Sequence, residues 1–455
     1  MRRIWLLLWL GISFAIFGIL YSSQAQTSPS EKKVIPAAPP NASFPRSGAG
    51  TVLTQERGNQ GPAVLLSRSA EASATKPRDG TKMPENAQPI FFSAHRAMEW
   101  LKRTLKRDGR FVYGFQPALC VQLDGDNFAS QAGAAFALAR AARYFRDEAG
   151  TAKARLAILR LKLETMVDPG DKTESIRYTA APPTAVNRLA SHGLLLSAVH
   201  ELDSAEKCAD LLKMAEQLCN YLRPQQRPDG SLFVSVGSNL MKSGADDIDA
   251  EHAGWALQGI VRSQKHGPAP WKIELVRKAR GFYHTQWQGS KNIATVCSHT
   301  PAYAQAYLIT KDNAFAQTVF AMNDWLIGLQ YRDDLDSARK HWSGGFQRFR
   351  DGKPELAAPD ISSALPAESL AEACRVAKYA GDLARLQRYE RALIQNVHFL
   401  MSLQYTSQTT KHFVDPFVPS ILGAFHASHQ DGNLRIDYTQ HALCAMVQYL
   451  DGVIE

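Results

Sequence analysis

The densest group of residues able to exchange protons lies just before position 253. Asp246, Asp247 and Asp249 precede Glu251 and His252. A carboxylate beside a histidine, or beside a second carboxylate, can work as a general acid and general base, one group donating a proton and the other accepting one. At a helix N-terminus the helix dipole would stabilise the glutamate carboxylate and disfavour a charged histidine. Helix capping alone would also explain the aspartates, so both interpretations stay open.

A second group of this kind lies near the C-terminal end. Asp437, a plausible helix cap, is followed by Gln440-His441-Ala442, which repeats the pattern of Glu251-His252-Ala253. A polar residue at such a position could line a pocket or bond a neighbouring helix. The candidate catalytic residues from the two groups are Glu251, His252, Asp249, Asp437 and His441.

These groups belong to a rhythm that runs along the chain. Six similar triplets begin 60, 60, 53, 67 and 69 positions apart: Gln131-Ala132-Gly133, Ser191-His192-Gly193, Glu251-His252-Ala253, Ala304-Gln305-Ala306, Ala371-Glu372-Ala373 and Gln440-His441-Ala442. Each triplet lies at the start of a predicted helix of small residues, and an amphipathic helix follows it. A period of this size, with one helical hairpin per repeat, indicates a repeat architecture.

Two sets of six helices follow from the pattern. The helices of small residues, apolar nearly all round, are expected near 128, 189, 250, 302, 368 and 438. Helices with one polar face are expected near 92, 147, 203, 271, 312 and 382, with Asp203, Asp312 and Asp382 as N-caps. Inner and outer sets of six predict an all-α (α/α)6 toroid, closed by the helix over 94–105. An open solenoid of the same hairpins is the alternative.

Long loops precede several of the inner helices, over 106–127, 167–187, 223–248, 331–363 and 404–436. They exceed the usual two to eight residues between packed helices. In a toroid they all lie on one face, where long loops on a rigid scaffold commonly carry function.

Three parts are expected along the chain. Residues 1–25 have the arginines, the apolar run over 4–21 and the small residues of a signal peptide, and an uncleaved membrane anchor is the alternative. Residues 26–90 are rich in Pro, Ser, Ala and Gly and are predicted to be a disordered linker. Residues 91–455 form the toroid, so an exported protein, periplasmic or secreted, is expected.

Composition argues against several classes of function. Of the net charge of +9, residues 1–90 carry +5, from ten Lys/Arg and five Asp/Glu. The toroid is therefore only weakly basic, and no nucleic-acid partner is predicted. Six scattered cysteines predict few or no disulfides. His426 and His429 have metal-ligand spacing without an obvious third ligand, so no metal or other cofactor is predicted.

Local motifs resemble those of the α/α toroid group. Gln226-Arg227-Pro228-Asp229-Gly230-Ser231-Leu232-Phe233 is similar to the Q-x-x-D-G-S-W repeat of squalene-cyclase-like proteins, in which the glutamine and the aromatic residue tie adjacent helix ends together. Degenerate copies follow Gln330 and Gln404. The group includes terpenoid cyclases and prenyltransferases as well as glycoside hydrolases, sugar epimerases and polysaccharide lyases. The cyclase DxDD acid and a convincing prenyltransferase zinc set are not matched, which ranks a terpenoid-cyclase-like activity third.

The resemblance and the predicted export together favour a protein that acts on or binds a carbohydrate at the loop face, as a hydrolase, lyase or epimerase. A sugar packs its C–H face on aromatic rings and needs polar groups around it. The candidate substrate-binding residues are His192, Trp342, Phe346, Arg348, Tyr303, Arg435 and Gln440. The second hypothesis is a non-catalytic toroid that binds a protein or cell-wall partner.

Overall fold

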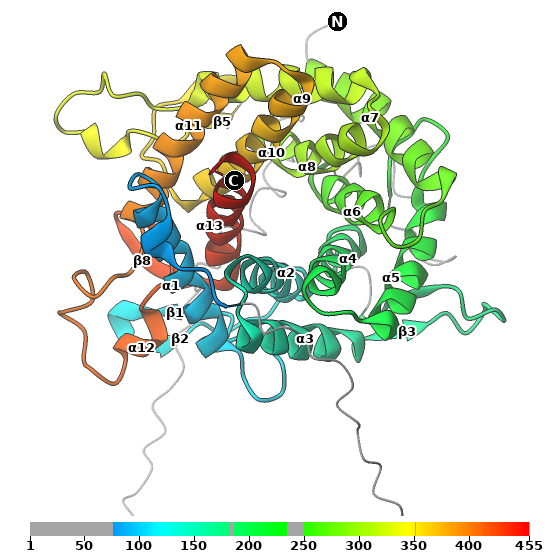
Figure 1. The fold of residues 1–455 in the computed structure, drawn as a ribbon, viewed down its shortest axis with the longest axis horizontal. Helices are drawn as coiled ribbons and strands as arrows, with labels where there is room; N and C mark the ends of the chain where they lie inside the picture. The colour runs from blue at the N-terminus through cyan, green and yellow to red at the C-terminus, as the bar shows by residue number, and fades with distance from the viewer. Residues whose placement is uncertain (1–75, 182–185, 234–249, 351, 455) are drawn as a thin grey trace, which may run out of the picture. The chain divides into compact units, whose positions relative to one another are not determined.

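The computed structural model describes residues 76–181, 186–233, 250–350 and 352–454 (Figure 1). All of them fall within one compact unit, Ser73–Glu455. The predicted leader, most of the predicted linker and the run Asp246, Asp247 and Asp249 lie outside the described residues.

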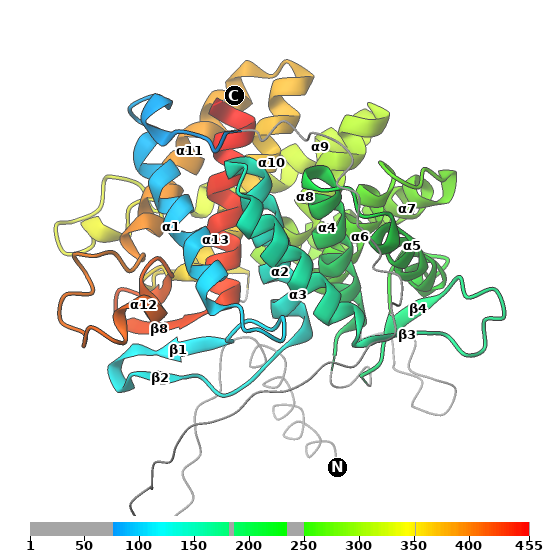
Figure 2. The same ribbon diagram turned by 60° about the horizontal axis from the view of Figure 1, so that its bottom comes forward.

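In the described part of the chain, twelve long helices alternate between an inner and an outer ring (Figures 1 and 2). The inner helices are α2 (Phe128–Phe145), α4 (Arg188–Ala205), α6 (Ala250–Ser263), α8 (Ile293–Thr310), α10 (Ala364–Ala380) and α13 (Ile436–Tyr449). The outer helices are α1 (Gln88–Thr104), α3 (Glu148–Lys162), α5 (Ala209–Leu222), α7 (Pro270–Gly289), α9 (Asn313–Leu326) and α11 (Leu383–Ser402).

The inner ring is closed. Each inner helix packs against the next, and α13 packs against α2 and against α1, the first outer helix. This arrangement confirms the (α/α)6 toroid and excludes the open solenoid. The folded part also begins slightly earlier than position 91, because Ala87 and Ile90 are fully buried and α1 starts at Gln88.

Small residues let neighbouring inner helices approach closely. A Cβ on Gly193 of α4 would lie 2.0 Å from the Trp255 carbonyl oxygen of α6, and one on Gly254 would lie 2.6 Å from the Ser298 carbonyl carbon of α8. Both contacts join the second turns of adjacent helices, so the N-terminal ends of these inner helices lie side by side and the helices run parallel. Their N-terminal ends, with the long loops that precede them, therefore share one face, which we call the loop end.

The glutamine motif ties this face together, as the resemblance implied. The amide of each motif glutamine donates to a carbonyl of the following turn and to a carbonyl of the next outer helix: Gln226 to Gly230 and Leu275, Gln330 to Gly344 and Ala392, and Gln404 to Gly423 and Ser93. The three turn glycines have φ of +99°, +85° and +95°. The last tie joins the sixth hairpin to the first and so helps to close the ring.

Short strands and turns fill the loops. A four-stranded sheet has the order β2 (Val121–Gln122), β1 (Gly114–Gln116), β8 (Asp431–Arg435), β7 (His426–Ser428). Two hairpins pair β3 (Thr165–Val167) with β4 (Arg177–Thr179) and β5 (Arg348–Arg350) with β6 (Lys353–Glu355), all antiparallel. The remaining elements are η1 (Gly80–Lys82), η2 (Pro117–Leu119), η3 (Arg223–Gln225), η4 (Ile327–Leu329), η5 (Lys340–Trp342), η6 (Ile361–Ser363), α12 (Val418–Ile421) and a terminal π turn, η7 (Leu450–Ile454).

Some predicted helix boundaries were wrong. Helix α8 begins at Ile293, nine residues before the expected 302, so Gln305 lies in its C-terminal half. Asp203 belongs to the end of α4 and is not the N-cap of α5, although its side chain accepts the Cys208 N–H. Asp312 and Asp382 do cap α9 and α11. All six cysteine thiols are free. Within the described ranges, no helix combines the length and apolar character needed to cross a bilayer.

Candidate active site at the loop end of the inner ring

A histidine and a glutamate from neighbouring inner helices form the closest acid–base pair at the loop end. His441 is the sixth residue of α13, and Glu368 is the fifth residue of α10. His441 Nδ1 lies 2.6 Å from Glu368 Oε1. The Glu368 side chain is 5% exposed, whereas that of His441 keeps 19% of its surface exposed. The glutamate is thus a buried partner, and the imidazole is the member that solvent can reach.

The surroundings of the imidazole favour its charged form. Burial by itself would lower the pKa of His441, but the charge of Glu368 and the hydrogen bond to it outweigh burial, and Asp437 and Glu251 add to the effect. The pKa of His441 is therefore raised above its ordinary value. A histidine in this state can donate a proton near neutral pH.

The arginine and aspartate before His441 form a second charged pair. The Arg435 Nε donates to Asp437 Oδ1 at 2.9 Å, and its Nη2 donates to Asp437 Oδ2 at 2.5 Å. The guanidinium also lies over the rings of Tyr113 and Tyr438, at 5.3 and 5.0 Å. Asp437 lies in the first turn of α13, after the N-cap Arg435, so its predicted capping role was wrong. The pairing instead fixes a planar guanidinium at the N-terminus of α13.

The other predicted acid–base group starts α6. Glu251 and His252 are half-buried in its first turn, and each makes an interaction with its surroundings. The charge of Glu251 contributes to the raised pKa values of His441 and of the Cys297 thiol. Glu251 therefore belongs to the same electrostatic environment as His441. Asp249, its predicted partner, lies outside the described residues.

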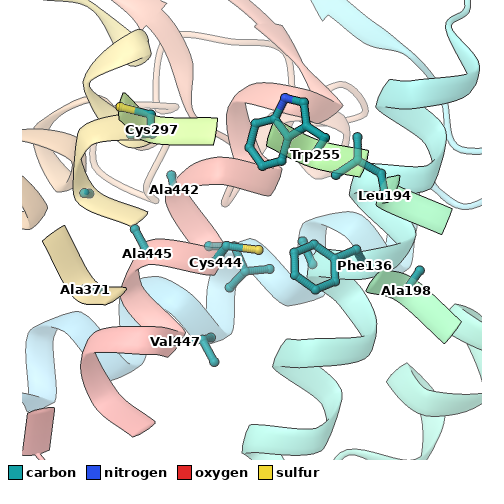
Figure 3. Packing of buried hydrophobic residues seen from close by; sticks show 14 of the residues in the cluster. Phe136, Leu194, Ala198, Trp255, Cys297, Ala371, Ala442, Cys444, Ala445 and Val447 are labelled. Carbon is teal, nitrogen blue, oxygen red and sulfur yellow. The ribbon is translucent and has the colours of Figure 1, made fainter. Parts of the chain in front are cut away.

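An apolar layer lies beneath the pair. Figure 3 shows Phe136, Leu194, Trp255 and Cys444, from four different inner helices, directed toward the interior of the ring. Their exposed fractions are 1%, 6%, 7% and 1%. The Trp255 ring lies 5.7 Å from that of His441, at 31°. The tryptophan thus provides a flat apolar surface beside the imidazole, a feature that the sequence prediction omitted.

Four predicted substrate-binding residues are buried inside the scaffold. His192 Nε2 accepts the Thr179 N–H at 3.1 Å, and burial followed by the charge of Arg188 lowers its pKa to about 3. Tyr303 is fully buried with its hydroxyl 2.8 Å from His299 Nδ1. Phe346 belongs to the core, and the Gln440 amide packs against Gly133 of α2. These side chains hold elements together, and their predicted role in substrate binding stays a prediction.

Two further predicted residues lie in the segment between α9 and α10, part of which extends outward past α11 (Figure 1). Trp342 packs against Tyr331, with ring centroids 5.3 Å apart. Arg348, exposed on β5, pairs with Asp360 at 2.9 Å. Both therefore serve the packing of their own loop. Of the predicted binding residues, Arg435 is the one bonded to Asp437, an acid whose charge acts on His441.

Glu368 was missed because the triplet was aligned one turn too late. The pattern selected Glu372 as the counterpart of His441, but the partner of His441 lies four residues earlier on the same helix. Two glutamates one turn apart on an inner helix were the available signal. Among the described residues no group of three or more His, Cys, Asp or Glu side chains could hold a metal ion. His426 and His429 instead contact the Ser428 carbonyl and the Ser402 hydroxyl.

No family model matches the chain, and no curated protein sequence matches it. Solved structures do. D-mannose isomerase superposes with a TM-score of 0.57 at 10% identity, covering 81% of this chain and 100% of its own. The unsaturated glucuronyl hydrolase of a Bacillus species, which degrades glycosaminoglycan, gives 0.56 at 14% identity, covering 80% and 97%. The α-1,6-mannanase of a Salegentibacter species gives 0.54 at 10% identity, covering 80% and 100%.

These proteins share the double ring of helices over most of both chains, while their identity to this chain is too low to carry residue roles across. The likeness is therefore one of fold. Together with the closed ring of six hairpins, it shows that this chain has the (α/α)6 toroid fold of these solved structures.

Proposed function

We propose that this protein is an exported carbohydrate-active enzyme whose active site is the loop end around His441 and Glu368. The observation that carries the proposal is the 2.6 Å contact between a reachable imidazole and a buried carboxylate, within the field of two further acids. The similar solved structures include a glucuronyl hydrolase, a mannanase and a mannose isomerase, all of which act on sugars. The reaction class is hydrolase, lyase or epimerase.

His441 and Glu368 have different roles in proton transfer. An ionised Glu368 accepts the Nδ1 hydrogen of His441, which leaves Nε2 as the nitrogen that gains and loses a proton. Glu368 thereby orients the ring and stabilises its charged form. His441 then serves as general acid or base, with Asp437, Glu251 and His252 as the remaining candidates for the opposite role.

Binding groups suited to a sugar surround the pair. The indole of Trp255 offers a surface for a C–H face, and Tyr113 and Tyr438 flank the guanidinium of Arg435. Arg435 can hold a carboxylate or hydroxyl of the substrate, although its bidentate bond to Asp437 must then be shared.

The second candidate is a toroid that binds a glycan, protein or cell-wall partner without catalysis. The apolar layer of Phe136, Leu194, Trp255 and Cys444 favours it, because side chains fill the interior of the ring directly below the pair. Membrane attachment through residues 4–21 remains part of either proposal.

The test is a product screen with the purified protein on α-1,6-linked mannooligosaccharides, unsaturated glucuronyl disaccharides, cellobiose and mannose, followed by NMR. For a converted substrate, His441→Ala is compared with His398→Ala, an exposed histidine on outer helix α11. Loss of turnover in the first variant alone supports the proposal. Equal activity of the two variants would show that His441 is not part of the active site. Binding of a glycan without conversion would favour the second candidate.

A further inference from the structure

Three arginine side chains converge on one carboxylate at the end of the inner ring opposite to the loop end. Glu201 Oε1 accepts Nε and Nη2 of Arg140, both at 3.1 Å, and Nη1 of Arg262 at 2.9 Å. Glu201 Oε2 accepts Nε of Arg143 at 3.2 Å. All four residues lie in the C-terminal halves of α2, α4 and α6. We call Arg140, Arg143, Arg262 and Glu201 the arginine cluster.

Positive charge exceeds negative charge around this cluster. Asp451 pairs with Arg143 at 2.8 Å, and Glu372 pairs with Arg375 at 2.7 Å. The ion-paired groups are thus four guanidiniums against three carboxylates: Arg140, Arg143, Arg262 and Arg375 against Glu201, Glu372 and Asp451. Guanidiniums thus outnumber carboxylates by one among these ion-paired groups, while Glu368, the partner of His441, also acts on Arg140 through its charge. An excess of charge is costly in such a partly dehydrated place.

One guanidinium donor is also unused. Arg140 is 4% exposed, and its Nη1 has no hydrogen-bond partner among the described residues. Burial first, and then the charge of Arg140, lower the pKa of Arg262, as expected where guanidiniums crowd together. The aromatic face of Phe136 lies 4.5 Å from the Arg140 guanidinium carbon and 5.2 Å from that of Arg262. The ring supports both cations without neutralising either.

The cluster can be reached from solvent at its edge. The Arg143 and Arg262 side chains keep 31% and 17% of their surface exposed, whereas Glu201 keeps 8%. The apolar layer around Phe136 and Cys444 lies between the cluster and the His441 pair. A ligand here would therefore enter from the far end of the ring.

We propose that the arginine cluster binds a small oxyanion, a carboxylate or a phosphate group, at the end of the ring opposite to the active site. Guanidinium groups match the planar geometry of such oxygens and bind them with two parallel bonds. The anion would take the unused Arg140 Nη1 and share Arg143 and Arg262 with Glu201. It would neutralise the surplus charge and bind α2 to α6. This site is independent of the function proposed above.

The test is isothermal titration calorimetry of the full chain with inorganic phosphate and, separately, with acetate, at pH 7 and constant ionic strength. We expect saturable one-to-one binding of at least one of them, and a rise of the melting temperature by mass action. The preference between the two probes tells whether a phosphate or a carboxylate fits. Absence of saturable binding by both, or equal binding of chloride, would overturn the proposal.

Variants locate the site. Arg262→Gln and Arg143→Gln should each weaken binding by about tenfold or more, because each removes a charged hydrogen bond to the anion. Arg143→Gln is the milder change, at the exposed edge. Arg385→Gln is the matched control, an arginine of outer helix α11 bound to Asp324 and Asp382. Unchanged affinity in both cluster variants, or an equal loss in the control, would refute the assignment.

Discussion

The two ends of the inner ring are built from the same six helices and carry different chemistry. At the loop end, a reachable histidine has one buried glutamate, and the nearby arginine has its own aspartate. At the far end, three arginines share one glutamate that is 8% exposed. The first arrangement leaves a proton donor facing the loops. The second joins three helices through one carboxylate. The proposed reaction site and the proposed anion site thus lie at opposite ends of the same scaffold.

The comparison predicts its largest effect at His441. His441→Ala should lower turnover of a converted substrate by about 10²–10⁴-fold, because a general acid or base is lost. The melting temperature should also fall, because the buried Glu368 loses its partner, but by less than for Glu201→Ala, in which three guanidiniums lose theirs. Steady-state kinetics and thermal unfolding on one sample check both parts. A variant that unfolds but, while folded, keeps its activity would reverse the roles assigned to the two ends.

Glu201→Ala should mainly lower the stability of the fold. It leaves three guanidiniums without their shared carboxylate, and breaking such a buried pair typically costs about 3–5 kcal/mol in the free energy of unfolding. Urea denaturation measures this change. Glu99→Ala, a partly exposed partner of Lys102, is the control and should cost about 1 kcal/mol or less. Equal losses in the two variants would mean that the far end contributes no special cohesion.

A tie at the loop end should have an intermediate effect. Gln404 is buried and bonds to Ser93 and Gly423, so Gln404→Ala leaves several buried backbone and side-chain groups unpaired. We expect a loss of about 1–3 kcal/mol in the free energy of unfolding. Gln408→Ala, in the exposed part of the following loop, is the comparison variant. A negligible difference between them would show that the motif does not help to close the ring.

The smallest effect concerns the pH dependence of the pair. Glu368→Gln removes the charge that raises the pKa of His441, so burial should prevail and the pKa of His441 should fall. The raised pKa stabilises the fold below the ordinary histidine pKa, and this stabilisation is lost as pH rises through the folded value. NMR titration of the His441 ring and the pH–rate profile should both shift to lower pH. An unchanged titration of His441 in this variant would show that Glu368 does not control the pKa of His441.

Much of the fold was predictable because it depends on local patterns. Apolar spacing gave ten of the twelve helix starts to within four residues. The exceptions are α5, which begins six residues after the expected start, and α8, which begins nine residues before it and contains Pro301. Asp312 and Asp382 cap their helices through bonds to nearby N–H groups, which sequence reveals directly. Asp203 failed as a cap because α4 runs on through it.

The site was predictable only in part. Four residues selected from the sequence near helix starts interact in the structure: Glu251, Asp437, His441 and Arg435. The charges of Glu251 and Asp437 raise the pKa of His441, and Arg435 bonds to Asp437. His192 and Gln440 were selected by the same reasoning, and Tyr303 as an aromatic residue suited to a sugar. In the structure all three are packed against neighbouring groups. A repeat pattern predicts approximately where a residue lies along its helix. The group that its side chain contacts depends on how the neighbouring helices pack around it.

The sequence by itself determined twelve helices, their alternation and the face that carries the long loops, because these follow from periodicity and chain order. Only the tertiary structure decided which side chains meet. The bond between His441 and Glu368 joins residues 73 positions apart, and that between Arg140 and Glu201 joins residues 61 apart. Such contacts depend on the rotation and close approach of packed helices, which glycines such as Gly193 permit and which no local pattern records.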